Sequence, residues 1–457
     1  MDENKNRELF EHTPVARAVS KMAIPAIIGQ LIILIYNMAD TFFIGRTNNP
    51  FMVASASLIL PVFNITLSIA SLTGVGGGAL ISRLFGEHED EEAKKVCSFS
   101  IYFAASMAIL FSVATLLFMR PLLNVLGADE DTFAYARSYA LFVIVIGGLP
   151  TIMTNVLSNL VRSVGESGKA GFGVTLGGVI NIALDPLFMF VLLPKGQEIV
   201  GAGIATCLSN CISCLYFIIT IKRLGNQSVL GLTSLSRLPE KASIRQVFAV
   251  GVPTALATLL FDVDYIVLDK LMSGYSNVAL AAVGIVLKAE RLPLNVGIGI
   301  CQGMVPIVAY NYAAKNHKRM KSVSRFALLC GIGFAILSIT MYEIFAPYIM
   351  RFFIDDAETV LLGTSFLRIR CLATILMFAS FYHVHLFNSY GQGRYALLLG
   401  VTRWAVFNIP MLFLMNRLVG MYGLVWSQLL ADILTVTLSV IVHEGFRKKN
   451  FPRIEQS

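Results

Sequence analysis

The chain has 457 residues, of which 56% are hydrophobic and 14% are charged, and its mean hydropathy is +0.71. Soluble globular domains carry about 25% charged residues, so this composition excludes that class and indicates an integral membrane protein. The net charge of +8 then reports membrane topology and attraction to anionic lipid headgroups, not nucleic-acid binding.

Apolar stretches long enough to cross about 30 Å of hydrocarbon recur from one end of the chain to the other. We predict an all-α membrane protein whose twelve transmembrane helices lie at 18–46, 51–82, 96–119, 133–161, 169–193, 199–221, 245–272, 277–313, 324–350, 357–388, 394–416 and 421–446. The polar residues 1–12 lack an apolar core with a cleavage site, so we expect no signal peptide.

The twelve spans form two copies of a six-helix unit. A shift of about 227 residues aligns Pro25 with Pro253, Gly76 with Gly303 and Gly165 with Gly391. Many secondary transporters are built from such repeats, with a central site that can face either side of the membrane. We predict two pseudo-symmetric lobes, residues 1–221 and 246–457 (the second with a cytoplasmic tail), joined by a polar cytoplasmic linker at 222–245.

Lys and Arg are unevenly distributed between the two sets of loops. The loops on the side of the termini hold most of them, including the linker and the basic segment 315–325. Because basic loops stay in the cytoplasm, we expect both termini to be cytoplasmic. Of the seven cysteines, Cys207, Cys211 and Cys214 share one helix face; packing as small hydrophobic residues is favoured over metal binding.

Two acids lie inside predicted spans of the first half. Asp40 is in the first span with Tyr36 one turn earlier, and Asp185 is in the fifth span with Asn181 one turn earlier. At 1.5 Å per residue they lie about 9 Å and about 13 Å below the outer ends of their helices. Because a carboxylate in hydrocarbon is costly, we predict that the pair faces a shared cavity and binds the coupling cation, the alternative being hydrogen bonds in helix packing.

The second half does not repeat these acids and carries a different set of charges. It includes Asp262 and Asp264 in the seventh span and Lys288, Glu290 and Arg291 in the eighth; further charges are Arg368, Arg370, Arg403 and Asp432. Structural ion pairing is one interpretation, because buried charges must pair. The other is that Asp262 or Asp264 contacts a cationic substrate and is balanced by Lys288 or Arg291.

Five motifs in order resemble the multidrug and toxin extrusion (MATE) family over essentially the full chain, and its DinF-like and MepA-like branch most closely. They are Tyr36-x-x-x-Asp40 with Gly45-Arg46, the glycines 74–78 before Ser82–Gly86, Asn181-x-x-x-Asp185-Pro186, the segment Gly303–Tyr312, and the turn Gly391–Arg394.

This resemblance implies a V-shaped multi-pass carrier in a bacterial or archaeal cytoplasmic membrane that exports lipophilic cationic drugs in exchange for H⁺ or Na⁺. It implies a proton site at Tyr36, Asp40, Asn181, Asp185 and, more loosely, Thr206. We expect a monomer that needs no cofactor, with membrane lipids and small cationic drugs as its partners.

Two other functions remain open at this point. A lipid-linked precursor flippase of the same superfamily would line its cavity with basic residues, and those that would allow this are Lys288, Arg291, Arg368, Arg370 and Arg403. An intramembrane enzyme is disfavoured, because the sequence has no HExxH or GxSxG motif and a duplicated plan would be surplus to catalysis.

Overall fold

The computed structural model describes residues 2–224, 229–231, 233 and 237–451, and these residues form helices and no strand. The first half contains α1 (Asp2–Glu11), α2 (Val15–Gly45), α3 (Pro50–Glu87), α4 (Asp90–Leu117), α5 (Met119–Val125), α6 (Glu130–Ala140), α7 (Gly148–Ser163), α8 (Ser167–Pro186) and α9 (Glu198–Leu224). The second half contains α10 (Lys241–Ser273), α11 (Asn277–Ala313), α12 (His317–Phe353), α13 (Ala357–Cys371), α14 (Thr374–Ser389), α15 (Gly393–Val401), α16 (Ile409–Val419) and α17 (Met421–Asn450). Three π-helical segments interrupt this pattern: η1 (Leu141–Ile146), η2 (Leu187–Leu192) and η3 (Thr402–Asn408).

The twelve predicted spans are confirmed in the described residues. Ten helices, counted through their π segments, are long and apolar enough to cross a membrane, and two bent pairs supply the remaining spans. The bent pairs are α6–η1 with α7 and α13 with α14, each bent by 45°. They occupy the fourth and tenth places in the chain, which are equivalent places in the two halves.

Both bent spans begin with the same helix cap. Asp129 accepts a hydrogen bond from the Thr132 backbone at 2.9 Å, and Asp356 accepts one from the Thr359 backbone at 2.8 Å. The Thr132 hydroxyl and backbone hydrogen bonds lower the pKa of Asp129, and those of Thr359 lower the pKa of Asp356. Each carboxylate satisfies a free N–H group of the first helical turn. The repeat seen in the sequence is therefore present in local structure as well.

The two lobes meet mainly where α2 packs on α11 and where α3 packs on α10. Two equivalent glycines allow these crossings. A Cβ atom at Gly303 would lie 2.5 Å from the Ala23 Cα atom, and one at Gly76 would lie 2.1 Å from the Val247 carbonyl oxygen. Small residues of this kind let membrane helices approach backbone to backbone.

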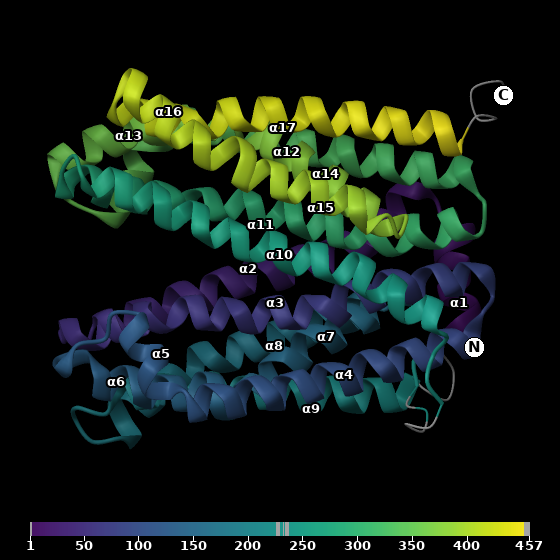
Figure 1. Ribbon diagram of the computed structural model, residues 1–457, viewed down its shortest axis with the longest axis horizontal. Coiled ribbons are helices and arrows are strands. Elements are labelled where there is room, and N and C mark those ends of the chain that lie inside the picture. Colours follow the sequence, from purple (N-terminus) through teal and green to yellow (C-terminus); the bar gives the residue numbers. More distant parts are fainter. Residues whose placement is uncertain (1, 225–228, 232, 234–236, 452–457) are drawn as a thin grey trace.

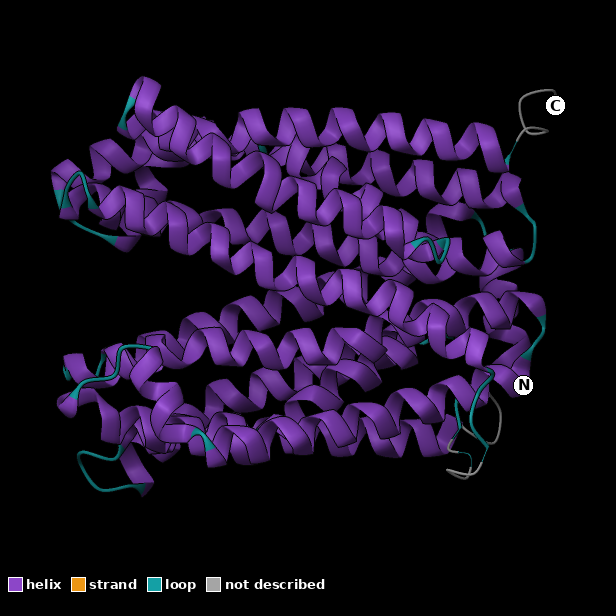
Figure 2. Ribbon diagram, in the orientation of Figure 1, coloured by secondary structure: helices purple, strands orange, loops and turns teal. Residues whose placement is uncertain are grey.

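From these crossings the lobes diverge in one direction only. Figures 1 and 2 show the two bundles converging at the end that holds both termini and spreading apart toward the other end. At the level of the crossings, the Gln30 amide donates to the Gln302 side-chain oxygen of the other lobe at 3.2 Å. The arrangement is the V shape that the family resemblance implied.

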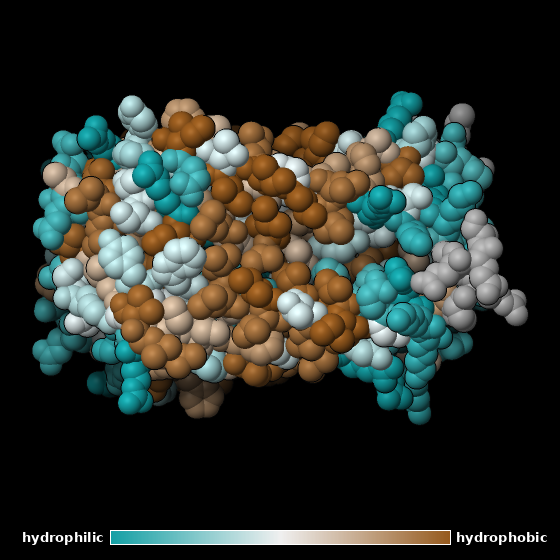
Figure 3. All heavy atoms as spheres, turned by 90° about the horizontal axis from the view of Figure 1, so that it is seen from above, coloured by the Kyte–Doolittle hydropathy of each residue, from teal (hydrophilic) through white to brown (hydrophobic). Residues whose placement is uncertain are grey.

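The molecular surface has the composition expected for a membrane protein. In Figure 3 a hydrophobic band covers the middle of the molecule and hydrophilic residues gather at both ends. Exposed apolar side chains such as Leu110, Leu117 and Val191 occur on the spans. In water such a surface would drive association, whereas lipid tails cover it without penalty.

The linker packs on the first lobe. Helices α9 and α10 extend into both ends of the range 222–245. Between them, Val229 and Leu230 are buried, and the Thr233 backbone N–H donates to the Ser98 hydroxyl of α4 at 2.7 Å. The Glu92 carboxylate of α4 then accepts from the Glu240 backbone at 2.7 Å, which caps the start of α10.

Candidate functional site

The polar residues of the first lobe come together where α2, α6, α8 and α9 meet. Tyr36 and Asp40 lie on α2, Asn181 and Asp185 on α8, and Thr206 on α9. The Asn181 amide donates both to the Asp185 carboxylate and to the Thr206 hydroxyl, each at 3.3 Å. Helix α2 packs along α8, so Tyr36 and Asp40 lie beside the part of α8 that carries Asn181 and Asp185. The structure thus places all five predicted residues in one cluster.

Glycines on α8 set the distance between α8 and α2. A Cβ atom at Gly171 would lie 2.4 Å from the Pro25 carbonyl oxygen, and one at Gly178 would lie 3.3 Å from the Tyr36 ring. The absence of side chains at these two positions lets α2 lie directly on α8. That close contact brings Asp40 to the same neighbourhood as Asp185.

A sixth residue of the cluster, Tyr139, was not predicted from the sequence. It lies on α6, is 8% exposed, and its hydroxyl donates to the Asp40 carboxylate at 3.3 Å. Its counterpart at the 227-residue shift is the fully buried Phe366, which has no hydroxyl group. A hydroxyl at this position of the fourth span, where the tenth span has Phe366, was the available signal.

Three oxygen atoms of this cluster are buried and accept no hydrogen bond from the described residues. They are Asp40 Oδ1, Asn181 Oδ1 and Asp185 Oδ2. Asp185 is 0% exposed and Asn181 is 2% exposed, so bulk water does not satisfy them. Buried acceptors without partners are costly. A proton on a carboxylate, or a small cation between these oxygens, would remove that cost.

The helices of this cluster change from α to π geometry beside it. The segment η1 follows directly after Tyr139 and Ala140, and η2 follows directly after Asp185 and Pro186. Pro186 has no backbone N–H to donate, so the regular hydrogen-bond ladder cannot continue through it. Short π segments of this kind often occur at functional sites.

The second lobe contains a buried network of hydrogen bonds in place of a pair of acids without a cationic partner. The Asn408 amide donates to Asp264 at 2.9 Å and to the Gln428 side chain at 3.2 Å. Gln428 donates to Asp432 at 2.8 Å, and Asp432 forms an ion pair with Arg403 at 3.0 Å. The third π segment, η3, carries both Arg403 and Asn408.

The expected balance of Asp264 by Lys288 or Arg291 needs correction. Both cations are exposed, and Arg291 lies over the Tyr265 ring at 5.7 Å. The inward-facing residue of that helix is Glu290, which pairs with Arg370 at 2.7 Å. Lys288 and Arg291 do not point into the protein interior, because the charged residue that this turn of α11 directs inward is Glu290, which lies between them in the sequence. The side chain of Asp262 lies outside the described residues.

Comparison with known proteins places this geometry in a family. The MatE family model matches the chain twice, over residues 25–187 and 253–414. The multidrug export protein MepA of Staphylococcus aureus (strain MSSA476) is 31% identical over 434 residues, which cover 95% of this chain and 94% of that protein. MepA of Staphylococcus haemolyticus (strain JCSC1435) is 30% identical over 96% of each chain.

Solved structures share the fold. An outward-facing multidrug resistance transporter of the same family superposes with a TM-score of 0.90 at 20% identity, over 96% of this chain and 97% of that one. A point mutant of the Vibrio cholerae transporter VcmN also gives 0.90, at 21% identity over 96% of this chain and 98% of that one.

Proposed function

Since the chain belongs to the MATE family of multidrug export transporters, we propose that it exports lipophilic organic cations in exchange for H⁺ by alternating access. The observation that carries this proposal is the cluster around Asp40 and Asp185. Among the described residues, the ion pairs whose two side chains are both buried are those of Glu290 and Asp432, and neither Asp40 nor Asp185 has a cationic partner. The two acids are therefore free to bind a mobile cation.

Exchange follows from the number of charges that the cluster can hold. Two carboxylates in one dry site repel each other, so at least one of them favours a proton or a bound cation. With one carboxylate already protonated, a second proton taken from outside neutralises the site, and loss of that proton to the cytoplasm restores one negative charge, which attracts a cationic drug. The drug and the proton then compete for one negative charge, which couples their movements in opposite directions.

The substrate class follows from the charge of the acids and from the relatives. A site whose acids lack an internal cationic partner attracts a positively charged substrate. The staphylococcal relatives carry the name multidrug export protein.

The proposal is tested with purified protein in vesicles loaded with ethidium. Asp40→Asn or Asp185→Asn should lower efflux driven by a pH gradient at least tenfold and abolish proton movement driven by the drug. Asp131→Asn, at an exposed acid near the start of α6, is the matched control and should leave both rates unchanged. Normal pH-driven efflux in both single variants would contradict the coupling role of these acids. Efflux that follows a Na⁺ gradient instead would identify the coupling ion as Na⁺.

The flippase alternative loses support in the structure. Of its basic residues, Arg370 pairs with Glu290 and Arg403 pairs with Asp432, and all four side chains are buried. A diphosphate would have to displace these carboxylates. Transport of anionic lipid intermediates across the vesicle membrane, without transport of any cation tested, would favour the flippase function. Turnover by the protein in detergent, where transport has no meaning, would favour an enzyme.

A further inference from the structure

The short helix α1 contacts both lobes at the end where they converge (Figure 1). It precedes the first membrane span and takes no part in the cluster around Asp40. Its residues are largely polar, yet Leu9 is 2% exposed and Phe10 is 0% exposed. A polar terminal segment that buries two large apolar side chains is held by specific contacts and is not a free tail.

One set of contacts joins α1 to the first lobe. Arg7 forms an ion pair with Asp90, in which Nη2 contacts both carboxylate oxygens at 2.8 and 2.9 Å, and its Nη1 donates to the Phe85 carbonyl oxygen at 2.9 Å. The Arg7 guanidinium also lies 4.2 Å from the centre of the Phe85 ring. The Asn6 amide donates to Glu166 at 3.3 Å. Hydrogen bonds between charged groups, such as that of Arg7 with Asp90, are among the stronger polar contacts in proteins.

A second set joins α1 to the second lobe. The Arg319 guanidinium donates to the carbonyl oxygens of Leu9, at 3.2 Å, of Phe10 and of Thr13. These carbonyl groups lie at the C-terminal end of α1, where a positive charge is favoured. The Asn311 amide also donates to the Phe10 carbonyl oxygen at 3.0 Å, and the Tyr310 hydroxyl donates to Glu11.

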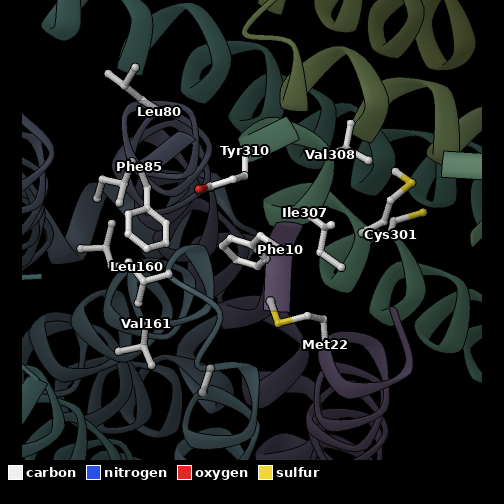
Figure 4. Packing of buried hydrophobic residues seen from close by; sticks show 14 of the residues in the cluster. Phe10, Met22, Leu80, Phe85, Leu160, Val161, Cys301, Ile307, Val308 and Tyr310 are labelled. Carbon is white, nitrogen blue, oxygen red and sulfur yellow. The ribbon is translucent and has the colours of Figure 1, made fainter. Parts of the chain in front are cut away.

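Between the two sets, Phe10 fills the space between the lobes. Its ring centre lies 6.1 Å from that of Phe85 in the first lobe and 5.2 Å from that of Tyr310 in the second. Figure 4 shows Phe10 beside both rings, with Met22 and Ile307 nearby. The rings of Phe85 and Tyr310 themselves lie 5.4 Å apart, so the three rings contact one another as a triangle. Separation of the lobes at this end would move the Tyr310 ring away from Phe10 and Phe85.

We propose that α1 is a latch that holds this end of the transporter closed. The inference rests on the alternating access proposed above, because in the opposite state the converging ends must part. Helix α1 continues through residues 12–14 into α2 of the first lobe, so it stays with that lobe. The contacts that break are those with Tyr310, Asn311 and Arg319, and they stabilise the closed state only.

The latch is tested by electron paramagnetic resonance distance measurements between spin labels on the two lobes. Labels are placed at Glu89→Cys and Lys321→Cys, two exposed positions near the converging ends, with Cys211, Cys214 and Cys330 replaced by Ser. Arg319→Ala and deletion of residues 2–11 should each raise the population of the longer distance. We expect a change of roughly tenfold or more for Arg319→Ala, because it removes charge-assisted hydrogen bonds.

Lys318→Ala, at the exposed neighbouring residue, is the control and should leave the distances unchanged. The Arg319→Ala variant keeps the test valid if the deletion disturbs folding through loss of Leu9 and Phe10. Unchanged distances in Arg319→Ala overturn the latch, whatever the rate of drug transport. Normal coupling in Asp40→Asn and Asp185→Asn would contradict the proposed function and leave the distances unaffected, so the two failures are distinguishable.

Discussion

Asp185 and Asp432 are acids of nearly equal burial with different surroundings. Asp185 is 0% exposed and Asp432 is 1% exposed. Within the described part of the chain, Asp185 accepts a hydrogen bond only from the Asn181 amide on its own helix, whereas Asp432 accepts from Gln428 and pairs with Arg403. A carboxylate compensated by Arg has no need of another cation. The first lobe therefore keeps an acid available for exchange, and the second lobe uses an acid to hold its helices together.

Removal of the Asp432 charge should destabilise the protein. Asp432→Asn leaves Arg403 buried without its acidic partner, and breaking a buried pair in this way costs roughly 3–5 kcal/mol. The control is Glu343→Gln, which breaks the exposed pair with Arg368 at 3.7 Å and should cost about 1 kcal/mol or less. Thermal unfolding of the two variants in detergent measures the difference. Equal unfolding temperatures would show that the Arg403 pair contributes no more than a surface pair.

Tyr139 should support the coupling site through its hydroxyl group. Tyr139→Phe keeps the ring but removes the donor to Asp40, and a hydrogen bond to a charged group contributes roughly 1.5–3 kcal/mol. We expect efflux driven by a pH gradient to slow by roughly tenfold or more, with unfolding temperature little changed. Tyr135→Phe, one turn earlier on α6, is the control. Equal efflux rates in the two variants would show that the Tyr139 hydroxyl does not contribute to the coupling site.

Much of the first-lobe site could be predicted because ionised side chains are rare and costly in a membrane. Asp40 and Asp185 stand out in the sequence for that reason. Tyr139 does not, since an aromatic residue with one hydroxyl is common in apolar helices. In the second lobe, charges alone did not reveal their pairing. The partner of Asp264 is the uncharged residue Asn408, which in turn donates to the uncharged residue Gln428.

At the scale of helices, glycine positions decide how closely the lobes approach. Gly303→Ala would place a Cβ atom 2.5 Å from the Ala23 Cα atom, so α2 and α11 must move apart. We expect a lower unfolding temperature and a shift in the spacing of the lobes. Gly333→Ala on α12 is the control, because a Cβ atom there meets nothing within 4 Å. In a helix that change should be neutral or stabilise by up to about 1 kcal/mol. Equal unfolding temperatures in the two variants would contradict the close crossing.

The membrane spans were predictable, but the short helices and bends were not. Length and hydropathy locate a span to within a few residues because the residues that face lipid are predominantly apolar. Helix α1 is polar and only 10 residues long, and isolated helices of that length are marginal. It depends on tertiary contacts such as those with Arg319, which no local pattern reveals.

At the scale of the whole molecule, duplication explains the shared architecture of the two lobes, and sequence divergence explains their different functional residues. The family model matches each half once, and the two bent spans and two aspartate caps repeat at equivalent places. The buried acids do not repeat. An exactly symmetric pair of lobes would hold two identical sites. This chain instead has an exchangeable acid pair in one lobe and a compensated network in the other, so we expect one coupling site per molecule.

The orientation of the V in the membrane is the last prediction. The converging end carries Lys318, Arg319 and Lys321 of α12 and the basic end of α17, so the rule that basic loops stay inside places it in the cytoplasm. Single cysteines at Lys195→Cys, in the loop before α9, and at Lys318→Cys report the two sides, because both positions are exposed. A membrane-impermeant maleimide added to intact cells should label the first position and reach the second only after lysis. Labelling of Lys318→Cys in intact cells would reverse the orientation. The α1 latch would then close the outer face, and proton entry would have to occur from the cytoplasm.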